Sequence, residues 1–387
     1  MKKAIVMVLD GVGAGELPDA GEYGDRGSDT LGNVARAVGG LNLPGLQAMG
    51  LGNLHRIKGV EPVPSPIASW GRMAEASRGK DSTTGHWEMM GIISTSPMPT
   101  FPGGFPPGVI ERFQELTGRP VLGNEVASGT EIVARLGREQ VETEGLIVYT
   151  SADSVFQVAA HEGVVPVAEL YEYCRMARDM LSPPELGVGR VIARPFTGEE
   201  GNYVRTARRK DFSLPPPNPT LLDLFAENGV PVCGVGKIDD LFAHRNIETV
   251  HAASNDEEMA ILLDMTCRCE GGFVFANFCD FDTQWGHRNN FVDFAAGLKA
   301  FDSWLPSFMS ILSPGDLLII TADHGNDPTT PSTDHSREYA PLLCYSPGIP
   351  GRNLGIRGTF SDISRTLCDF FDLECPFPGV SFLGGEL

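Results

Sequence analysis

The sequence predicts an α/β protein in which helices flank a mostly parallel sheet, and three observations favour that class. Short apolar runs rich in Val, Ile, Leu and Phe recur along the 387 residues. Uninterrupted runs of this length are typical of strands buried on both faces, as in a parallel sheet. Segments with a helical spacing of apolar residues lie between the runs, and polar residues follow the runs directly. Open α/β sheets place their ligand sites at those carboxyl ends.

The expected elements follow from these patterns in chain order. The apolar runs predict strands at Ala4–Leu9, Leu146–Tyr149, Val230–Val235, Gly272–Phe278, Leu317–Thr321 and Leu342–Tyr345. Capping residues and periodicity predict helices from Ser28 to about Val38, from Ser254 to about Cys269, over Phe291–Leu312 and from Ser361 to about Leu373. We expect Pro306 to kink or break the third of these helices, because proline lacks the N–H that a helix interior requires.

Two proline-rich stretches, Ser94–Pro107 and Leu214–Pro219, interrupt this alternation. Such stretches are stiff and extended, and a pair of them suits the borders of an inserted domain that closes over a site. We therefore expect a discontinuous metal-binding core, residues 1–96 and 215–387, and an inserted smaller α/β cap domain for substrate binding, residues 97–214. A pair of ordinary surface loops is the simpler alternative.

Composition narrows the choice of partners. The chain has 30 Lys and Arg against 50 Asp and Glu, a net charge of −20. That charge repels phosphate backbones and anionic bilayers, so we expect neither a nucleic acid nor a membrane partner.

No stretch approaches the ~18 apolar residues of a membrane span, and Ala4–Leu9 is short for a secretory signal. The 8 scattered cysteines contain no C-x-x-C pair and indicate reduced thiols in a cytoplasmic protein.

Carboxylates and imidazoles gather where three of the expected strands end. They are Asp10, Asp282, His287, Asp323, His324 and, slightly later in the chain, His335. Such ligands suit Mn²⁺, Zn²⁺, Fe²⁺ or, less well, Mg²⁺. His55, His244 and His251 stand alone in the sequence and are interpreted as surface residues or satisfied core residues.

The segment Lys80–Gly91 carries hydroxyls at Ser82, Thr83 and Thr84 just before a glycine and a helix-compatible run. A hydroxyl at a helix N-terminus lies near the positive end of the helix dipole and near free N–H groups. A metal ion bound to it would lower its pKa and make it a nucleophile at neutral pH. A plain helix cap is the alternative and would be preferred on this segment alone.

These stretches together resemble the alkaline phosphatase superfamily of two-metal phosphoryl- and sulfuryl-transfer enzymes. Longer strings resemble the bacterial phosphopentomutase family, and the resemblance covers essentially the whole chain. The strings are Lys80–Gly91, Ser151–Gln157 with His161-Glu162, Gly189–Pro195, Gly236–Asp240 and Asp280–Asn289. The first and the last of them are specific, whereas the Asp-His-Gly that begins at Asp323 is shared across the superfamily.

The resemblance implies a two-metal site. It implies one ion held by Asp10, Asp323 and His324 with the hydroxyl of Thr84, and a second held by Asp282, His287 and His335. Thr84 corresponds to the family's phosphorylated nucleophile. The family usually has Thr where this chain has Ser82, which puts little in doubt because that position is not the nucleophile. Mn²⁺ is the favoured metal, and a sugar bisphosphate is expected as the activator.

The predicted cap carries a basic segment between Arg190 and Lys210, which is informative in so acidic a chain. Arginine forks match phosphate oxygens. The resemblance implies that the residues facing the sugar phosphate are Arg190 and Arg205, with Ser151, Asp153 and Ile192. Lys237, at the end of an expected core strand, is a further phosphate-binding candidate. A solvated surface is the alternative for the basic segment.

The resemblance implies an isomerase that interconverts ribose 1-phosphate and ribose 5-phosphate, and the 2-deoxyribose equivalents, through a phosphothreonine and a bisphosphate intermediate. The expected partners are thus small-molecule pentose phosphates, and the sequence leaves the oligomeric state open, a monomer being one of the possibilities. The nearest alternatives are another phosphatase of the superfamily and a cofactor-independent phosphoglycerate mutase, which typically has Ser at the nucleophile position. A non-catalytic sugar-phosphate binder should have lost the nucleophile or some ligands, and every expected position is filled.

Overall fold

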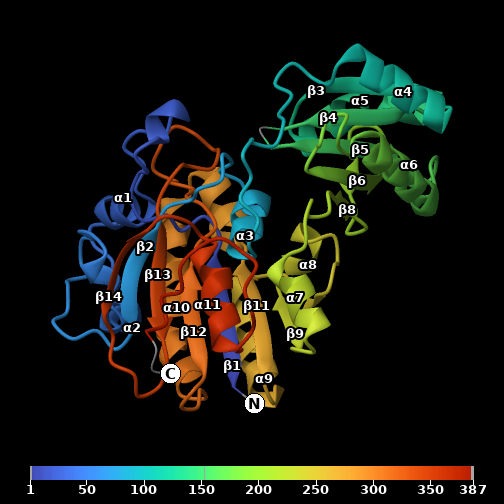
Figure 1. Cartoon of the computed structure of the whole chain (residues 1–387). Coiled ribbons are helices and arrows are strands. Elements are labelled where there is room, and N and C mark those ends of the chain that lie inside the picture. Colours follow the sequence, from blue (N-terminus) through green and yellow to red (C-terminus); the bar gives the residue numbers. More distant parts are fainter. Residues whose placement is uncertain (1, 152, 385–387) are drawn as a thin grey trace. The chain divides into compact units, whose positions relative to one another are not determined.

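The computed structural model describes residues 2–151 and 153–384 and divides into two compact units. The core unit comprises Met1–Pro97 and Pro216–Leu387, and the insert unit comprises Met98–Pro215. Each unit has its own sheet, drawn with element labels in Figure 1. The α/β class predicted from the apolar runs is confirmed.

The core unit is built on an eight-stranded sheet with the order β10-β9-β11-β1-β12-β13-β2-β14. The strands are β1 (Lys3–Leu9), β2 (Ser69–Met73), β9 (Val232–Val235), β10 (Glu248–Val250), β11 (Gly272–Phe278), β12 (Leu317–Thr321), β13 (Ala340–Tyr345) and β14 (Asn353–Arg357). Strands β10, β9, β11, β1 and β12 run parallel. The run at Leu342–Tyr345 differs from the parallel expectation, because β13 pairs antiparallel with both β12 and β2.

The register of the central strands sets the position of the site. Leu9 on β1 lies opposite Phe278 on β11, and Val8 lies opposite Thr321 on β12. The three strands therefore end at the same level, and the residues that follow them meet at one edge of the sheet. Strand β1 is central and almost entirely buried, as its continuous apolar run predicts.

Helices cover both faces of this sheet, with α9 and α10 on one face and α11 on the other (Figure 1). The core-unit helices are α1 (Thr30–Ala37), α2 (Pro44–Met49), α3 (Ser82–Met89), α7 (Leu221–Glu227), α8 (Ile238–Leu241), α9 (Asn255–Arg268), α10 (Phe291–Met309) and α11 (Asp362–Phe370). Short π and 3-10 turns follow β11 at Phe281–Trp285 and Gly286–Arg288.

Two helix ends differ from the expectation. Asp29, not Ser28, is the N-cap of α1, and its carboxylate accepts a hydrogen bond from the N–H of Gly32. A carboxylate also suits the positive end of the helix dipole. Helix α10 continues through Pro306 to Met309 and stops short of Leu312. Ser254 caps α9 as predicted, because its hydroxyl accepts from the N–H of Glu257.

The insert unit is a smaller α/β layer. Its sheet has the order β3-β4-β5-β6-β7, with β8 paired to β6. Its elements are α4 (Pro107–Thr117), β3 (Val121–Val126), α5 (Gly129–Thr143), β4 (Leu146–Thr150), β5 (Val155–His161), α6 (Val167–Met180), β6 (Arg190–Thr197), β7 (Val204–Arg205) and β8 (Lys210–Ser213). One apolar cluster joins this sheet to α4 and α6, and a second joins it to α5.

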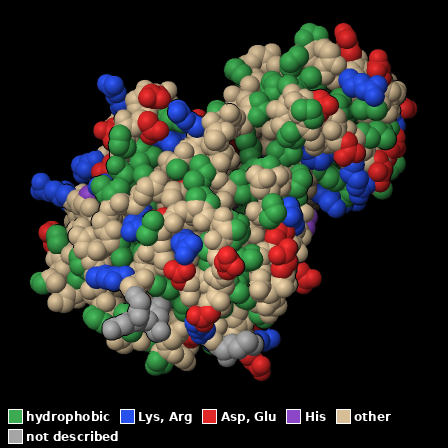
Figure 2. Space-filling view, viewed as in Figure 1, with side chains coloured by type: hydrophobic (Ala, Val, Ile, Leu, Met, Phe, Trp, Pro, Cys, Tyr) green, Lys and Arg blue, Asp and Glu red, His purple; other side chains and the backbone are tan. Residues whose placement is uncertain are grey.

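The surface carries charged side chains of both signs. Figure 2 shows Asp, Glu, Lys and Arg side chains distributed over the face in view, with apolar side chains in small areas between them. No helix formed by residues 2–151 and 153–384 has the length and apolar character needed to cross a bilayer. The eight cysteines are free thiols.

A buried carboxylate anchors helix α3. Glu88 is fully buried and accepts hydrogen bonds from the backbone N–H groups of Ala76, Ser77 and Phe360 and from the hydroxyl of Thr359. Each carboxylate oxygen therefore has a donor, and α3 is tied both to the loop that precedes it and to a loop that is distant in sequence. A buried acceptor that is fully hydrogen-bonded is stable without a countercharge.

We expect Glu88→Gln to lower the free energy of unfolding by about 2–3 kcal/mol, because an amide NH₂ would face backbone N–H donors that it cannot satisfy. Urea denaturation followed by circular dichroism would measure the change. The exposed Glu115, which pairs with Arg112, provides the control, and Glu115→Gln should stay within about 0.5 kcal/mol of wild type. Equal midpoints for the two variants would contradict the anchoring role.

Candidate metal centre

The aligned strand ends bring acidic side chains together inside the core unit. Asp10 follows β1, Asp282 lies in the turn after β11, and Asp323 and His324 follow β12. All four are buried, with at most 4% of their surface exposed. His335 joins them from the loop between β12 and β13 and is also buried. Residues far apart in the sequence thus form one cluster.

One ligand group consists of Asp282, His287 and His335, whose ligand atoms lie within 4.8 Å of one another. Asp282 is 3.2 Å from Nε2 of His287 and 3.3 Å from Nε2 of His335. Nδ1 of His287 lies 2.7 Å from the carbonyl of Thr333. That hydrogen bond places the proton on Nδ1 and leaves Nε2 as the lone-pair donor, the usual arrangement for a metal-binding imidazole.

The second group consists of Asp10, Asp282 and His324, so Asp282 belongs to both. Nε2 of His324 lies 3.3 Å from Oδ1 of Asp10 and 3.3 Å from Oδ2 of Asp323. The other oxygen of Asp323 accepts hydrogen bonds from the N–H groups of Gly11 and His324. Asp323 is therefore fixed by one oxygen, while its second oxygen faces the imidazole.

The residues present fit divalent cations. Asp10 Oδ1, Asp323 Oδ2 and His335 Nε2 are buried and make no hydrogen bond. Buried polar atoms without a partner are rare and costly unless an ion satisfies them. Separations of about 3.3 Å also match two ligand atoms that each lie about 2.1 Å from a shared ion. The carboxylate and imidazole donors suit Mn²⁺ and Zn²⁺.

The pKa shifts within the cluster also indicate a site for positive charge. Burial, together with the charges of Asp323 and Asp282, raises the pKa of Asp10. Burial also acts to raise the pKa of Asp282, but His335 and His287 hold that pKa well below 3.8. Burial acts to lower the pKa of His324, yet Asp323 and Asp10 raise it well above 6.5. The three carboxylates thus require positive charge beside them.

Helix α3 places its first turn against this cluster. A Cβ on Gly85 would lie 2.2 Å from the carbonyl oxygen of Asp323, so only glycine permits this approach. The hydroxyl of Ser82 lies 3.1 Å from Nε2 of His324. Thr84, almost fully buried on the same turn, donates its hydroxyl to Oδ2 of Asp81 at 2.6 Å. In this structure Ser82, not Thr84, contacts the imidazole.

Asp81 was not among the residues predicted for the site. It is the N-cap of α3 and accepts from both the N–H and the hydroxyl of Thr84. The signal that could have identified it is an aspartate directly before a run of hydroxyl residues and a helix, which is a typical N-cap pattern.

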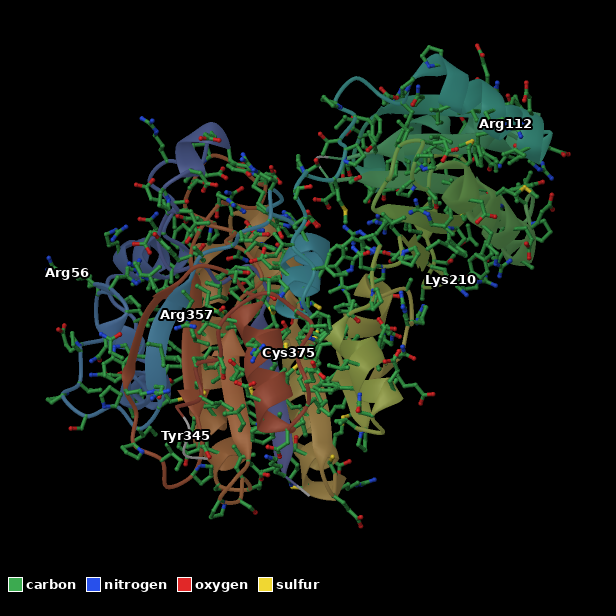
Figure 3. The ribbon with its side chains drawn as sticks, viewed as in Figure 1. Arg56, Arg112, Lys210, Tyr345, Arg357 and Cys375 are labelled. Atoms are coloured by element: carbon green, nitrogen blue, oxygen red, sulfur yellow. The ribbon has the colours of Figure 1, made fainter. Side chains whose placement is uncertain are left out.

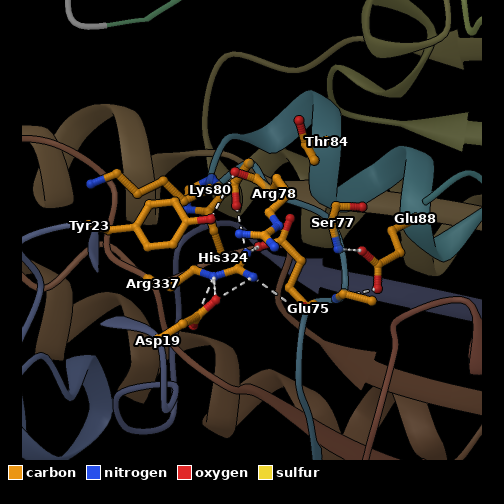
Figure 4. Close-up of polar contacts among 12 residues, drawn as sticks. Asp19, Tyr23, Glu75, Ser77, Arg78, Lys80, Thr84, Glu88, His324 and Arg337 are labelled. Carbon is orange, nitrogen blue, oxygen red and sulfur yellow. Dashed lines mark hydrogen bonds and ion pairs between the residues drawn. The ribbon is translucent and has the colours of Figure 1, made fainter. Parts of the chain in front are cut away.

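A buried arginine supports the loop that precedes α3 (Figure 4). The guanidinium of Arg337 donates to the carboxylate of Glu75 at 2.7 Å, to the carbonyl of Gly79 at 2.7 Å and to the carboxylate of Asp19. Nζ of Lys80 donates to the carbonyl of His335 at 2.7 Å. The loop that precedes α3 and the loop that carries His335 are therefore tied to each other.

The remaining predicted residues lie outside this cluster. Lys237 is exposed in the core unit at the start of α8. The other five are in the insert unit: Ser151, Asp153, Arg190, Ile192 and Arg205. Arg190 pairs with Asp153 at 3.2 Å and approaches Asp211 at 4.0 Å. Ile192 is buried on β6, and Arg205 is exposed on β7.

The fold and the site together define a metalloenzyme, and comparison with known proteins supports this class. The Metalloenzyme superfamily model matches residues 242–375. The solved PH0037 protein from Pyrococcus horikoshii has a similar fold, with a TM-score of 0.51 and 16% identity over 98% of this chain and 99% of that one.

The chain belongs to the phosphopentomutase family. It is 56% identical over 385 residues to the phosphopentomutase of Dictyoglomus thermophilum, covering 99% of this chain and 98% of that relative. It is 54% identical over 384 residues to the phosphopentomutase of Anaeromyxobacter sp., with the same coverage. The family resemblance expected from the sequence strings is thus confirmed.

We expect the protein to bind two divalent ions per chain and His335→Ala to retain about one. Of the two ligand groups that contain Asp282, only one contains His335, and its loss should weaken that ion's binding by more than about 100-fold. Asp282→Asn should reduce both, because Asp282 lies in both groups. Mn²⁺ content after dialysis, measured by mass spectrometry, tests this. His161→Ala is the control, and wild-type content in His335→Ala would contradict the assignment.

Proposed function

We propose that this protein is a metal-dependent phosphopentomutase that interconverts ribose 1-phosphate and ribose 5-phosphate, and the 2-deoxyribose equivalents. The observation that carries the proposal is the convergence of two carboxylate–imidazole groups with the hydroxyl-bearing turn of α3. Similarity to phosphopentomutases over nearly the whole chain supports the substrate class. The activity is that of an isomerase that moves a phosphoryl group within one sugar.

Two metal ions are assigned to the residues expected from the family. Asp10, Asp323 and His324, with Thr84, would hold one ion, and Asp282, His287 and His335 would hold the other. The place of Asp282 in both ligand groups supports two cation sites within one cluster. Bound cations would supply positive charge for the nucleophilic oxygen and for the equatorial oxygens of the transferring phosphoryl group. Mn²⁺ is the favoured ion.

Thr84 is proposed as the nucleophile that carries the phosphoryl group. In the forward step, a free hydroxyl of the sugar monophosphate attacks phosphorus, the P–O bond to Thr84 breaks, and a sugar bisphosphate forms. In the return step, Oγ1 of Thr84 attacks the other phosphate, and the P–O bond to the sugar breaks. A proton passes from the sugar hydroxyl to Oγ1 of Thr84 in the forward step and from Thr84 to the departing sugar oxygen in the return step. Asp81, which accepts the Thr84 hydroxyl at 2.6 Å, is the proposed carrier of that proton. A sugar bisphosphate would prime the resting enzyme.

The insert unit is proposed as a cap that binds substrate and excludes water, since water would hydrolyse the phosphothreonine. Ser151, Asp153, Arg190, Ile192 and Arg205 are its proposed contacts with the sugar phosphate. Lys237 of the core unit is proposed as a further phosphate ligand. A cytoplasmic location and a monomeric state stay predictions.

We expect Thr84→Ala to lower mutase activity by at least about 10³-fold, because no other oxygen would carry the phosphoryl group. Thr83→Ala should keep wild-type activity within a few-fold. Ser82→Ala should lower activity by about 10-fold or less, since Ser82 contacts His324 without carrying phosphate. Labelled ribose 5-phosphate with Mn²⁺ and a bisphosphate primer, followed by product analysis, measures all three variants.

The same assay separates the alternatives. Free phosphate without ribose 1-phosphate from wild type would indicate a phosphatase, and no turnover together with retained substrate binding would indicate a binding protein. Substantial activity in Thr84→Ala, with loss in Ser82→Ala, would move the nucleophile to Ser82. Intact mass after incubation with the bisphosphate reports whether the chain itself is phosphorylated.

A further inference from the structure

Strand β11 carries one polar side chain within its apolar run. The strand lies between β9 and β1 in the core-unit sheet, and side chains project from the faces of that sheet (Figure 3). Its sequence is Gly-Phe-Val-Phe-Ala-Asn-Phe, and all of these residues are buried. The asparagine, Asn277, is 2% exposed. A buried amide lowers folding stability unless its hydrogen bonds are made, so its presence in this strand needs a physical reason.

The amide of Asn277 is hydrogen-bonded to the metal cluster. Its Nδ2 donates to Oδ2 of Asp10 at 3.0 Å. Val8 lies opposite Asn277 in the pairing of β1 with β11, and alternation along the strand places Asp10 on the same face as Val8. The N–H of Asp10 donates to the carbonyl of Phe278 at 3.3 Å, so the pairing extends to Asp10. Strand register therefore brings this amide to this carboxylate.

The other atom of the amide gives the fold no further support. Oδ1 of Asn277 is buried and accepts no hydrogen bond from the residues that the structure describes, 2–151 and 153–384. A buried carbonyl oxygen without a donor lowers folding stability, and a leucine of similar size would avoid that cost. The bond to Asp10 is therefore the interaction that accounts for an asparagine at this position.

That bond makes the two oxygens of Asp10 different. The amide holds Oδ2, whereas Oδ1 accepts no hydrogen bond within the described part of the chain and lies 3.3 Å from Nε2 of His324. Asp323 has the same arrangement, because the N–H groups of Gly11 and His324 hold its Oδ1 and its Oδ2 has no donor among the described residues. At Asp323 the donors belong to the backbone. At Asp10 the donor is a side chain, which substitution can remove.

We propose that Asn277 is a positioning residue that makes Asp10 offer a cation one oxygen only, Oδ1. The proposal rests on the assignment of Asp10 to one of the two metal ions in the proposed function. Because Oδ2 is held, the carboxylate loses little rotational freedom when an ion binds. Hydrogen-bond partners of metal ligands change metal affinity by about 10- to 100-fold.

The number of oxygens that Asp10 offers also affects which cation binds. Ca²⁺ takes about six to eight oxygen ligands and accepts carboxylates through one or both oxygens. A carboxylate restricted to one oxygen, beside the imidazole of His324, therefore favours Mn²⁺ over Ca²⁺. Asn277 thus contributes to the metal selectivity of the site as well as to its affinity.

The test compares Asn277→Leu with Asn53→Leu in the full-length protein. Both changes replace an asparagine of the core unit, and the amide of Asn53 is hydrogen-bonded to the backbone of Val63. Calorimetric titration of chelator-treated protein with Mn²⁺ and, separately, with Ca²⁺ measures the affinities. Asn277→Leu should bind one Mn²⁺ about 10- to 100-fold more weakly, with equal or higher Ca²⁺ affinity. Asn53→Leu should match wild type for both metals.

The ratio of the two affinities separates positioning from a structural role. Loss of a purely structural contact would distort the cluster and weaken Mn²⁺ and Ca²⁺ binding together, and that result would overturn the proposal. Wild-type Mn²⁺ affinity in Asn277→Leu would also overturn it.

Asn277→Thr is the second variant, because threonine suits a strand. Its side chain is one bond shorter, so the hydroxyl should fall short of Asp10 and the affinity ratio should change in the same direction. Circular dichroism checks that both variants fold. Failure of both to fold would assign Asn277 to the stability of the sheet and reject the positioning role.

The outcome is separable from that of the proposed function, since neither titration uses a sugar phosphate or measures turnover. If wild type binds Mn²⁺ but lacks mutase activity, the proposed function fails and the comparison still decides the role of Asn277. If wild type is an active mutase and both variants keep the wild-type ratio, the proposed function stands and the positioning role is rejected. Absence of Mn²⁺ binding to wild type would reject both.

Discussion

The structure depends on one electrostatic constraint, the burial of three carboxylates at the ends of adjacent parallel strands. Asp10, Asp282 and Asp323 are each at most 4% exposed, and like charges so enclosed repel strongly. Imidazoles contribute part of the opposing charge, and divalent cations are the groups that complete it. The sheet cannot relieve this repulsion by moving one strand, since the register of β1 with β11 and β12 fixes all three positions.

A second set of buried polar contacts holds the hydroxyl-bearing first turn of α3 at this cluster. Glu88 fixes helix α3 to two loops, and Arg337 fixes the loop before the helix through the carbonyl of Gly79. Both side chains are hydrogen-bonded to several surrounding groups, and such networks restrict movement. Phosphoryl transfer, the reaction proposed for this site, is sensitive to the positions of the attacking and leaving oxygens, and a rigid scaffold would limit their movement. The buried polar contacts of the core unit thus fix the position of the first turn of α3 relative to the carboxylates.

The buried polar groups that lack a hydrogen-bond partner differ in charge between the two units. In the core unit the buried atoms without a hydrogen-bond partner include carboxylate oxygens of the metal cluster, which suit cations. In the insert unit they include Nε and Nη2 of Arg178, a cationic side chain. Buried polar atoms without a partner lower folding stability.

The sequence by itself determined five of the eight core strands (β1, β9, β11, β12 and β13), the α9 cap at Ser254 and the ligand types, because local apolar runs and caps encode them directly. Strands β2, β10 and β14 were not predicted. It also indicated the family through motif strings. Only the tertiary structure decided that β13 runs antiparallel, that Asp282 lies in both ligand groups and that Ser82 lies beside His324. These properties depend on distances between segments remote in the chain, and no local pattern contains such distances. Strand pairing and register supply them.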